Sequence, residues 1–181
     1  LFNIPKDNVI VTSACVAGWN YKDAEDIWLK IHKYFGNNFF LEVQYHNTDK
    51  QKELNKKILR IAKEHNIQII CGLDSHYVKE ENAVKRDQIL KYKNINYPDE
   101  EGWYLDYPDT QTVIKRFEEQ GVLNREEIYR AIMNTNVFVA ECEEIVLDRK
   151  FKIPSVYKGK TYKEKCKIYK DVLNKAYAKE K

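Results

Sequence analysis

Three short apolar runs, separated by two amphipathic stretches, constrain the fold of this 181-residue chain more than any other feature. The runs span residues 9–14, 39–46 and 67–71 and are rich in the β-branched and aromatic residues that favour strands. Between them, apolar residues recur at helical spacing, first in residues 24–35 and then in residues 54–62. A crossover of a dozen or more residues between strands predicts parallel pairing. The sequence therefore predicts an α/β fold.

Capping and turn residues set the expected ends of the first two helices. Asn20 is the expected N-cap of the first helix, Gly36 is its expected stop, and Ile27 is expected on its inward face. Asp49 is expected to open the second helix and Asn66 to close it. One face of each helix is therefore expected to pack against a core.

The second half of the chain predicts further helices. A charged helix is expected over residues 80–93, followed by an aromatic and acidic loop with two Tyr-Pro-Asp turns. A helical segment is expected over residues 109–148, with a stop at Gly121, a capping box of Asn124 and Glu127, and an apolar stretch at residues 137–146. Its Asp109 is interpreted as a surface or capping residue, as is Asp106 just before it.

Polar side chains alternate with apolar ones along the second predicted strand. Glu42, Gln44 and His46 are placed on a common face by the two-residue period of a strand. Two explanations remain open: this face is an exposed face of the sheet, or it is the polar lumen of a barrel that leads to a site.

Residue types that bind metals follow all three predicted strands. Cys15 ends the first, His46 ends the second, and Asp74 and His76 follow the third. Functional sites of parallel α/β folds lie at the carboxyl ends of the strands, so these side chains are expected to converge. In the alternative interpretation Cys15 is a small buried residue, Asp74 caps the helix near Glu80, and His76 lies at the surface.

Charge is unevenly distributed along the chain. Residues 149–181 hold twelve basic against three acidic residues, a formal charge of +9, which leaves −6 for residues 1–148. This basic segment is interpreted as either a nucleic-acid contact or a solvated face. Thr161 and Glu164 predict a capping box before a last helix, whose apolar stripe needs a partner surface and comprises Cys166, Tyr169, Val172, Leu173, Ala176 and Tyr177.

Composition indicates a cytoplasmic protein that does not contact a membrane. The four cysteines are widely spread without a CxxC pair, and no apolar run approaches the roughly 18 residues of a membrane span. No signal peptide is recognised at the start, and the missing initiator Met suggests a segment of a longer protein.

Several stretches resemble a known family when taken together and in order. VTSACVAG (residues 11–18), FFLEVQYH (39–46), the run from residue 51 to residue 83 that contains GLDSHYV, and AIMNTNVFVAECEEI followed by KIP are similar to the alpha subunit of bacterial replicative DNA polymerase III, a C-family polymerase. The similarity lies in the C-terminal part of its polymerase and histidinol phosphatase (PHP) domain. The resemblance implies a partial, distorted (β/α) barrel of PHP type over residues 1–108, a helical segment over residues 109–148, and a basic linker and helix over residues 149–181 that leads towards the palm.

The resemblance also implies a metal site of which this chain holds only the last part. Cys15, Asp74 and His76 fall on positions that bind metal in members with a complete site, and His46 and Glu42 lie near it. The remaining ligands, among them a His-x-His pair, are expected upstream. The metal implied for the complete domain is Zn²⁺ or Mn²⁺, and the parent's polymerase reaction uses Mg²⁺.

The implied function is a part of a DNA-directed DNA polymerase with a metal-dependent phosphoesterase site, expected to act as a 3′–5′ exonuclease. Implied partners are DNA and replisome subunits, and the isolated chain is expected to be inactive and to self-associate through an uncovered sheet edge. A stand-alone phosphoesterase such as a histidinol phosphatase is one alternative. The other is a metal-free scaffold or partner-binding domain of the polymerase.

Overall fold

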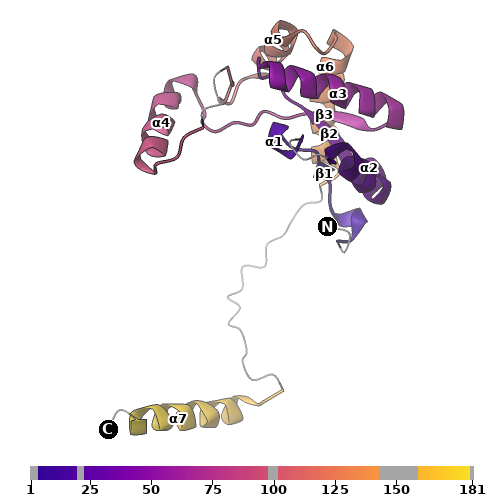
Figure 1. Ribbon diagram of the computed structural model, residues 1–181. Coiled ribbons are helices and arrows are strands. Elements are labelled where there is room, and N and C mark those ends of the chain that lie inside the picture. Colours follow the sequence, from indigo (N-terminus) through magenta and orange to yellow (C-terminus); the bar gives the residue numbers. More distant parts are fainter. Residues whose placement is uncertain (1–3, 20–22, 98–101, 143–158, 180–181) are drawn as a thin grey trace. The chain divides into compact units, whose positions relative to one another are not determined.

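The computed structural model describes residues 4–19, 23–97, 102–142 and 159–179 (Figure 1). The chain divides into two compact units, Leu1–Glu143 and Glu144–Lys181. The sequence-based domain boundaries after residues 108 and 148 follow from the family resemblance and stay predictions.

The described part of the first unit contains a parallel sheet of three strands in the order β1-β2-β3. The strands are β1 (Val11–Thr12), β2 (Phe39–Val43) and β3 (Gln68–Cys71). Val11 lies opposite Phe39, and Val43 lies opposite Cys71. Helices α2 (Ala24–Phe35) and α3 (Asp49–His65) form the crossovers between them (Figure 1). The predicted α/β architecture with parallel strands is therefore confirmed.

Two of the strands are shorter than the sequence predicts. β1 holds two residues, because Ala14 adopts a left-handed backbone conformation (φ 56°) and the short helix α1 (Val16–Trp19) begins soon after it. β2 ends at Val43, and residues 44–46 continue without strand pairing. There the backbone carbonyls accept hydrogen bonds from helix side chains instead of from a neighbouring strand.

Helix α2 packs on the sheet through a narrower face than predicted. Its buried residues are Ala24, Trp28 and Phe35. Ile27 is 45% exposed, because it lies about 80° around the helix from the middle of that face. Gly36 ends the helix at φ 58°, as predicted. The expected N-cap Asn20 lies outside the described residues.

Helix α3 begins at Asp49 and is closed by Asn66, both as predicted. Thr48 is its N-cap, and its hydroxyl oxygen accepts a hydrogen bond from the Gln51 backbone N–H at 3.3 Å. Asn66 closes the helix in the left-handed conformation that Asn tolerates better than most residues. The side chains of Leu54, Ile58 and Ile61 face the core.

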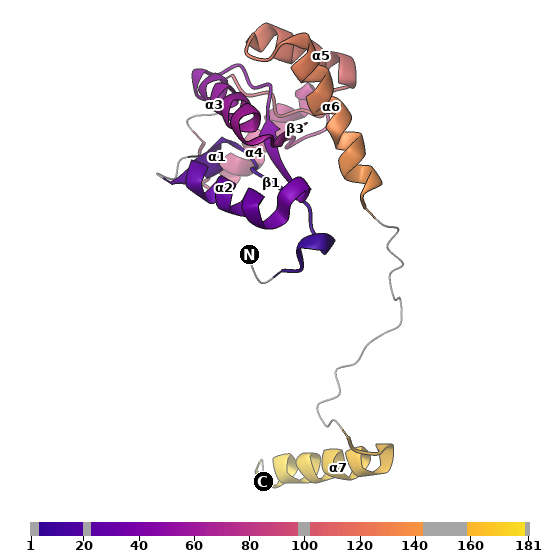
Figure 2. The same ribbon diagram turned by 90° about the vertical axis from the view of Figure 1, so that its right-hand side faces the viewer.

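Two further helices complete the core of the first unit. They are α5 (Thr110–Gln120) and α6 (Arg125–Ala140), with α6 beside β3 (Figure 2). Asp109 caps α5, Gly121 ends it, and Asn124 and Glu127 form the predicted capping box of α6. The apolar residues that these helices and their connection add to the core are Val113, Ile114, Phe117, Leu123, Ile128 and Ala131.

Helix α6 also covers the outer edge of the sheet. The Asn134 side chain donates a hydrogen bond from Nδ2 to the backbone carbonyl of Ile69 in β3 at 2.7 Å. An edge strand otherwise presents unpaired backbone groups to other chains. The β3 edge of the sheet is therefore covered by α6, which hinders pairing with a strand of another chain. Residues 143–146 of the expected apolar stretch lie outside the described residues.

Two charged helices have no buried side chains. The 3-10 helix η3 (Glu80–Asn82) leads into α4 (Ala83–Tyr92), close to the predicted range of residues 80–93. In the second unit, α7 (Tyr162–Lys179) follows the predicted capping box, in which Thr161 N–H donates to Glu164 at 2.7 Å. That the apolar stripe of α7 packs against a partner surface stays a prediction. Within the described ranges, no helix has the length and apolar character required to cross a membrane.

Candidate functional site at the strand ends

Asp74 and His76 lie together in the loop that follows β3. His76 Nε2 is 3.6 Å from Asp74 Oδ1, and both side chains are partly exposed. Asp74 adopts a left-handed backbone conformation (φ 51°), which short polar side chains tolerate and which recurs at functional loops. Lys79, rather than Asp74, is the N-cap of the following 3-10 helix. The interpretation of Asp74 as a helix cap is therefore wrong.

Residues 103–107 run alongside this loop and hold it in place. The His76 backbone N–H donates a hydrogen bond to the Leu105 carbonyl at 2.8 Å. The Ser75 hydroxyl donates to the Asp106 carbonyl, also at 2.8 Å. The loop that carries the Asp74–His76 pair is thus tied to a segment from far along the chain.

The same segment contacts His46, which follows β2. The Tyr104 backbone N–H donates a hydrogen bond to His46 Nδ1 at 3.2 Å, and the Trp103 ring lies 4.4 Å from the imidazole centroid. His46 is fully buried, and burial lowers its pKa to about 4, although the charge of Asp74 acts in the opposite direction. His46 is therefore a neutral side chain near the Asp74–His76 pair.

Glu42 lies on the polar face of β2, between Thr12 of β1 and Gly72, which follows β3. Its carboxylate accepts hydrogen bonds from the Thr12 hydroxyl at 2.9 Å and from Gln44 Nε2 at 2.8 Å. The carboxylate lies directly over Gly72, where an added Cβ would be 2.0 Å from Glu42 Oε1. Burial, followed by the charge of Glu42, raises the pKa of the Cys71 thiol to about 12. Gly72 thus provides the space that the carboxylate fills.

The polar face of β2 and its extension points into the protein. Gln44 and His46 are buried, and Glu42 is partly buried. The explanation of this face as an exposed side of the sheet is therefore wrong. The structure shows that these polar side chains point into the interior. That this interior is the lumen of a barrel stays a prediction.

Buried amide side chains from two helices hold the backbone beyond β2. Gln120 Nε2, at the end of α5, donates to the carbonyls of Gln44 at 3.0 Å and His46 at 2.7 Å. Asn55 Nδ2, on α3, donates to the same Gln44 carbonyl at 2.8 Å and to Gln120 Oε1 at 2.7 Å. These bonds replace the strand ladder and fix the position of His46.

Arg116 lies over two tyrosine rings and pairs with Asp106. Arg116 forms two hydrogen bonds with Asp106, at 2.7 and 3.0 Å, and both side chains are largely buried. The guanidinium carbon lies 4.3 Å from the Tyr104 ring centroid and 5.3 Å from that of Tyr45. The interpretation of Asp106 as a surface or capping residue is therefore wrong, because it is the partner of a buried arginine.

Cys15, the third expected ligand, lies between β1 and α1 and is half-buried. Its carbonyl accepts a hydrogen bond from the Gly18 N–H at 3.1 Å. In the part of the chain that the structure describes, no three His, Cys, Asp or Glu side chains are grouped closely enough to hold a metal ion. The convergence of Cys15 with Asp74 and His76 stays a prediction.

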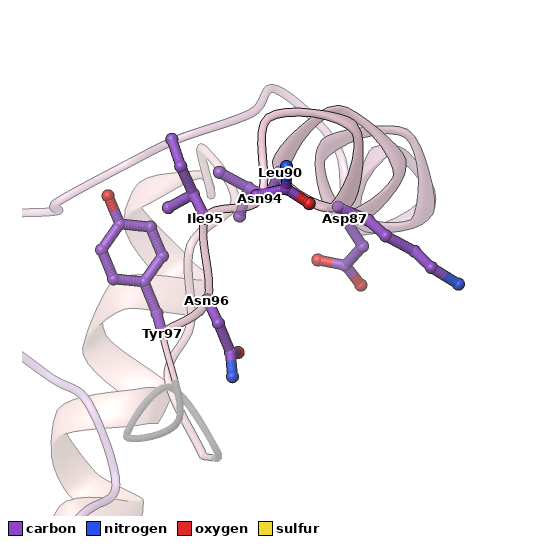
Figure 3. Close-up of a pocket in the computed structure, with 7 residues that line it drawn as sticks. Asp87, Leu90, Asn94, Ile95, Asn96 and Tyr97 are labelled. Atoms are coloured by element: carbon purple, nitrogen blue, oxygen red, sulfur yellow. The ribbon is translucent and has the colours of Figure 1, made fainter.

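Two surface hollows lie away from these residues. A pocket of about 450 Å³ lies between α4 and the residues that follow it, and its lining includes Asp87, Asn94 and Tyr97 (Figure 3). A groove of about 750 Å³ is lined by residues of α3, α6 and the start of β3, among them Gln68. Neither includes a predicted site residue.

Sequence reasoning missed the residues that position the site. Arg116 and Gln120 lie on an ordinary amphipathic helix, and Asn55 interrupts the apolar stripe of α3. Their one signal in the sequence is a polar side chain on a face that the helical period assigns to the core. That signal identifies a buried polar residue but not its partner.

Comparison with known proteins shows similarity to DNA polymerases. The chain is 33% identical to the DNA polymerase III subunit alpha of Borreliella burgdorferi over 92 residues, which are 46% of this chain and 8% of that protein. It is 29% identical to the Campylobacter jejuni subunit over 114 residues, 51% of this chain and 10% of that protein. A DNA-directed DNA polymerase of Bacillus phage SPbeta is 27% identical over 136 residues, 71% of this chain and 10% of that protein. No family model matches the chain.

The chain spans a tenth or less of the length of these relatives. Alpha subunits from several different bacteria match it at similar identity. Over about half of its length, the chain is therefore related in sequence to a short segment of the bacterial DNA polymerase III alpha subunit.

Proposed function

We propose that this chain is part of a DNA-directed DNA polymerase and contributes to a metal-dependent phosphoesterase site in a PHP-type domain. The observation that carries the proposal is the Asp74–His76 pair at the carboxyl end of a parallel strand, in a chain related to DNA polymerase III alpha subunits. Parallel α/β folds place their sites at this end. The expected reaction is 3′–5′ exonuclease cleavage of DNA.

The described residues fit a divalent metal only in part. A carboxylate and an imidazole suit Zn²⁺ or Mn²⁺, and Asp74 and His76 supply one of each. Two donors are too few for a hydrolytic centre, and the described residues do not group a third donor with them. Further donors would come from other parts of the parent, with Cys15 as the additional donor predicted in this chain.

When bound, a divalent metal of this kind supplies a nucleophilic hydroxide at neutral pH and neutralises charge on the phosphate. This chain contributes the carboxylate and the imidazole, held by residues 103–107. The left-handed backbone at Asp74 and the bond from His76 N–H to the Leu105 carbonyl fix the orientation of the loop. The chain's own part in the proposed chemistry is therefore to hold ligands in place.

The polymerase reaction and its Mg²⁺ would lie elsewhere in the parent. Nucleotide addition needs paired aspartates on a strand, and the three strands β1–β3 contain no aspartate. DNA is the proposed partner of the parent, together with replisome subunits. The six lysines of α7, whose described side chains are not buried, fit either a DNA contact or a solvated helix.

The test is Asp74→Asn in the full-length polymerase that contains this chain. We expect loss of exonuclease activity on a 3′-labelled single strand in Mn²⁺, with nucleotide addition retained. Asp87→Asn on the exposed helix α4 is the matched control and should retain both activities. The isolated 181 residues are expected to show neither activity. Full exonuclease activity of Asp74→Asn would overturn the proposal.

A second candidate function is a metal-free scaffold within the polymerase. The absence of a three-donor group among the described residues favours it. The metal content of the purified parent separates the two functions, because a scaffold would hold no stoichiometric Zn²⁺ or Mn²⁺. The stand-alone phosphatase is not favoured, since the relatives named above are polymerases.

A further inference from the structure

The loop around Asp74 and His76 has few buried side chains. Ser75, His76 and Val78 are exposed, and Asp74 is only partly buried. Between β3 and the 3-10 helix η3, residues 72–79 form neither helix nor strand. A segment with little packing is ordered mainly by its hydrogen bonds. The geometry of the two proposed metal ligands therefore depends on the hydrogen bonds that this loop makes.

The segment that precedes α5 supplies backbone hydrogen bonds to the loop. The Leu105 carbonyl accepts from the backbone N–H of His76 at 2.8 Å and from that of Tyr77 at 3.2 Å. The Tyr107 N–H donates to the Val78 carbonyl, also at 3.2 Å. Because the loop is bonded to this segment, whatever fixes the segment also fixes the proposed ligands.

Asp106 joins this segment to helix α5. Its backbone carbonyl accepts a hydrogen bond from the Ser75 hydroxyl at 2.8 Å. Its carboxylate accepts two hydrogen bonds from the Arg116 guanidinium, at 2.7 and 3.0 Å. The Arg116 and Asp106 side chains are only 11% and 15% exposed. Asp106 therefore bonds to the loop through its backbone and to the helix through its side chain.

Arg116 is itself held in one orientation. Its guanidinium carbon lies 4.3 Å from the ring centroid of Tyr104 and 5.3 Å from that of Tyr45. Phe117, the next residue on α5, is fully buried and anchors the helix in the core. A planar guanidinium that donates two bonds fixes both the distance and the direction of the carboxylate. A lysine at this position would keep the charge but not that geometry.

The burial of this ion pair favours a positioning role over a purely stabilising one. A buried ion pair adds little net stability, because the cost of removing both charges from water offsets most of their attraction. What the pair does determine is where Asp106 lies, and with it the segment to which the loop is bonded. Residues that orient metal ligands without binding the metal typically lower metal affinity about 10–100-fold when they are replaced.

We propose that Arg116 is a positioning residue for the Asp74–His76 site, which it orders through Asp106. The inference rests on the proposed phosphoesterase function and adds to it a dependence of metal affinity on helix α5. Arg116 acts on the proposed ligands through the hydrogen bonds that join residues 105–107 to the loop.

Amide hydrogen exchange tests the effect on the loop, measured by mass spectrometry in the full-length polymerase that contains this chain. In Arg116→Gln, we expect the backbone N–H groups of His76 and Tyr77 to exchange about tenfold faster, because the bonds that hold Asp106 are lost. Arg116→Lys should lie between Arg116→Gln and the wild type. Lys115→Gln, on the exposed face of the same helix, is the control and should exchange like the wild type.

Wild-type exchange of these amides in Arg116→Gln would overturn the proposal. If circular dichroism shows that Arg116→Gln is unfolded, Arg116→Lys gives the same comparison, because it keeps a positive charge beside Asp106.

Metal binding separates positioning from stability. Arg116→Gln should bind Mn²⁺ about tenfold more weakly than the wild type. Ile128→Val shortens a buried side chain of α6 by one methylene group and should lower the free energy of unfolding without changing Mn²⁺ affinity. If Ile128→Val lost as much Mn²⁺ affinity as Arg116→Gln, Arg116 would act on stability alone and the proposal would be overturned.

Failure of this inference can be told apart from failure of the proposed function. If Asp74→Asn loses its metal while Arg116→Gln keeps wild-type exchange and Mn²⁺ affinity, the role of Arg116 alone is overturned. If Asp74→Asn keeps its metal, the metal site is overturned. Faster exchange of His76 and Tyr77 in Arg116→Gln would then still support the ordering of the loop by Arg116, and wild-type exchange would overturn both.

Discussion

Gly72 shows how one missing side chain shapes the polar interior. Its backbone has no positive φ that would require glycine, so the requirement is for space. In Gly72→Ala, the new Cβ would meet Glu42 at Oε1, Cδ and Cγ, the nearest at 2.0 Å. Glu42 would have to move and give up its bonds to Thr12 and Gln44. We expect a loss of about 1–3 kcal/mol in the free energy of unfolding, measured by urea denaturation.

A second glycine supplies the control for this prediction. At Gly18 an added Cβ would be 3.4 Å from the Ser13 carbonyl oxygen, so Gly18→Ala should cost much less. In a Glu42→Ala background the cost of Gly72→Ala should also shrink, because the clash partner is gone. If Gly72→Ala lowered the free energy of unfolding equally in the wild type and in Glu42→Ala, the space at Gly72 would not be needed for Glu42.

His46 makes stability depend on pH in a defined window. Its pKa is lowered from 6.5 to about 4 in the folded chain. Between these values the unfolded state binds more protons than the folded state, so stability falls as pH falls through the window. The full effect is about 3 kcal/mol, at 1.36 kcal/mol per pKa unit.

His46→Gln tests this pH dependence. The variant should lose the part of the slope of stability against pH that lies between about 6.5 and 4, as measured by urea denaturation at a series of pH values. His65→Gln, at an exposed position, controls for the removal of a histidine and should keep the wild-type slope. A wild-type slope in His46→Gln would show that His46 is not titrating differently in the two states.

At the scale of elements, helix α5 supports the end of β2. Gln120 donates to two backbone carbonyls beyond the strand, and Asn55 bonds to Gln120. In Gln120→Ala these buried carbonyls lose donors, and we expect a loss of about 2–4 kcal/mol, measured by urea denaturation. Gln111→Ala, on the exposed face of the same helix, should be within about 0.5 kcal/mol of wild type.

The hydrogen bond between Asn55 of α3 and Gln120 of α5 allows a second test, by combining the two substitutions. Because Asn55 and Gln120 share one network, Asn55→Ala and Gln120→Ala together should cost less than the sum of the single changes. Additive costs in the double variant would mean that the two amides act independently.

The elements also show which parts of the fold could be predicted. Gly36, Asn66, Asp109 and the Asn124–Glu127 box act within one turn of chain, so local sequence was sufficient to place these helix ends. Exposure of Ile27 depends on how α2 lies on the sheet, which the sequence period does not specify.

The candidate site was predictable to a similar extent. Ligand-type residues could be placed at strand ends from the β–α alternation alone, and the structure brings Asp74 and His76 together. The contacts of residues 103–107 join positions tens of residues apart, for instance Tyr104 and His46. Such pairings depend on the loop path, which has no periodic signal. For the same reason the pairing of Arg116 with Asp106 could not be predicted.

At the scale of the whole molecule, α5 and α6 are part of the fold of the first unit. Their apolar residues share one core with the strands, and Asn134 of α6 protects the edge of β3. The sequence-based boundary after residue 108 separates these helices from the sheet. Because the sheet and the helices share one core, we expect them to unfold as one cooperative unit.

This arrangement predicts different behaviour for two truncated chains. Residues 1–143 retain the whole compact unit and should unfold in a single cooperative transition in urea. Residues 1–108 lack the core residues Val113, Phe117 and Ile128 and should be unfolded or molten, because burying less apolar surface cannot offset the entropy of ordering the chain. Near-ultraviolet circular dichroism and the urea transition measure both. A cooperative transition of residues 1–108 with native near-ultraviolet signal would show that the sheet folds independently and that α5 and α6 form a separate helical domain.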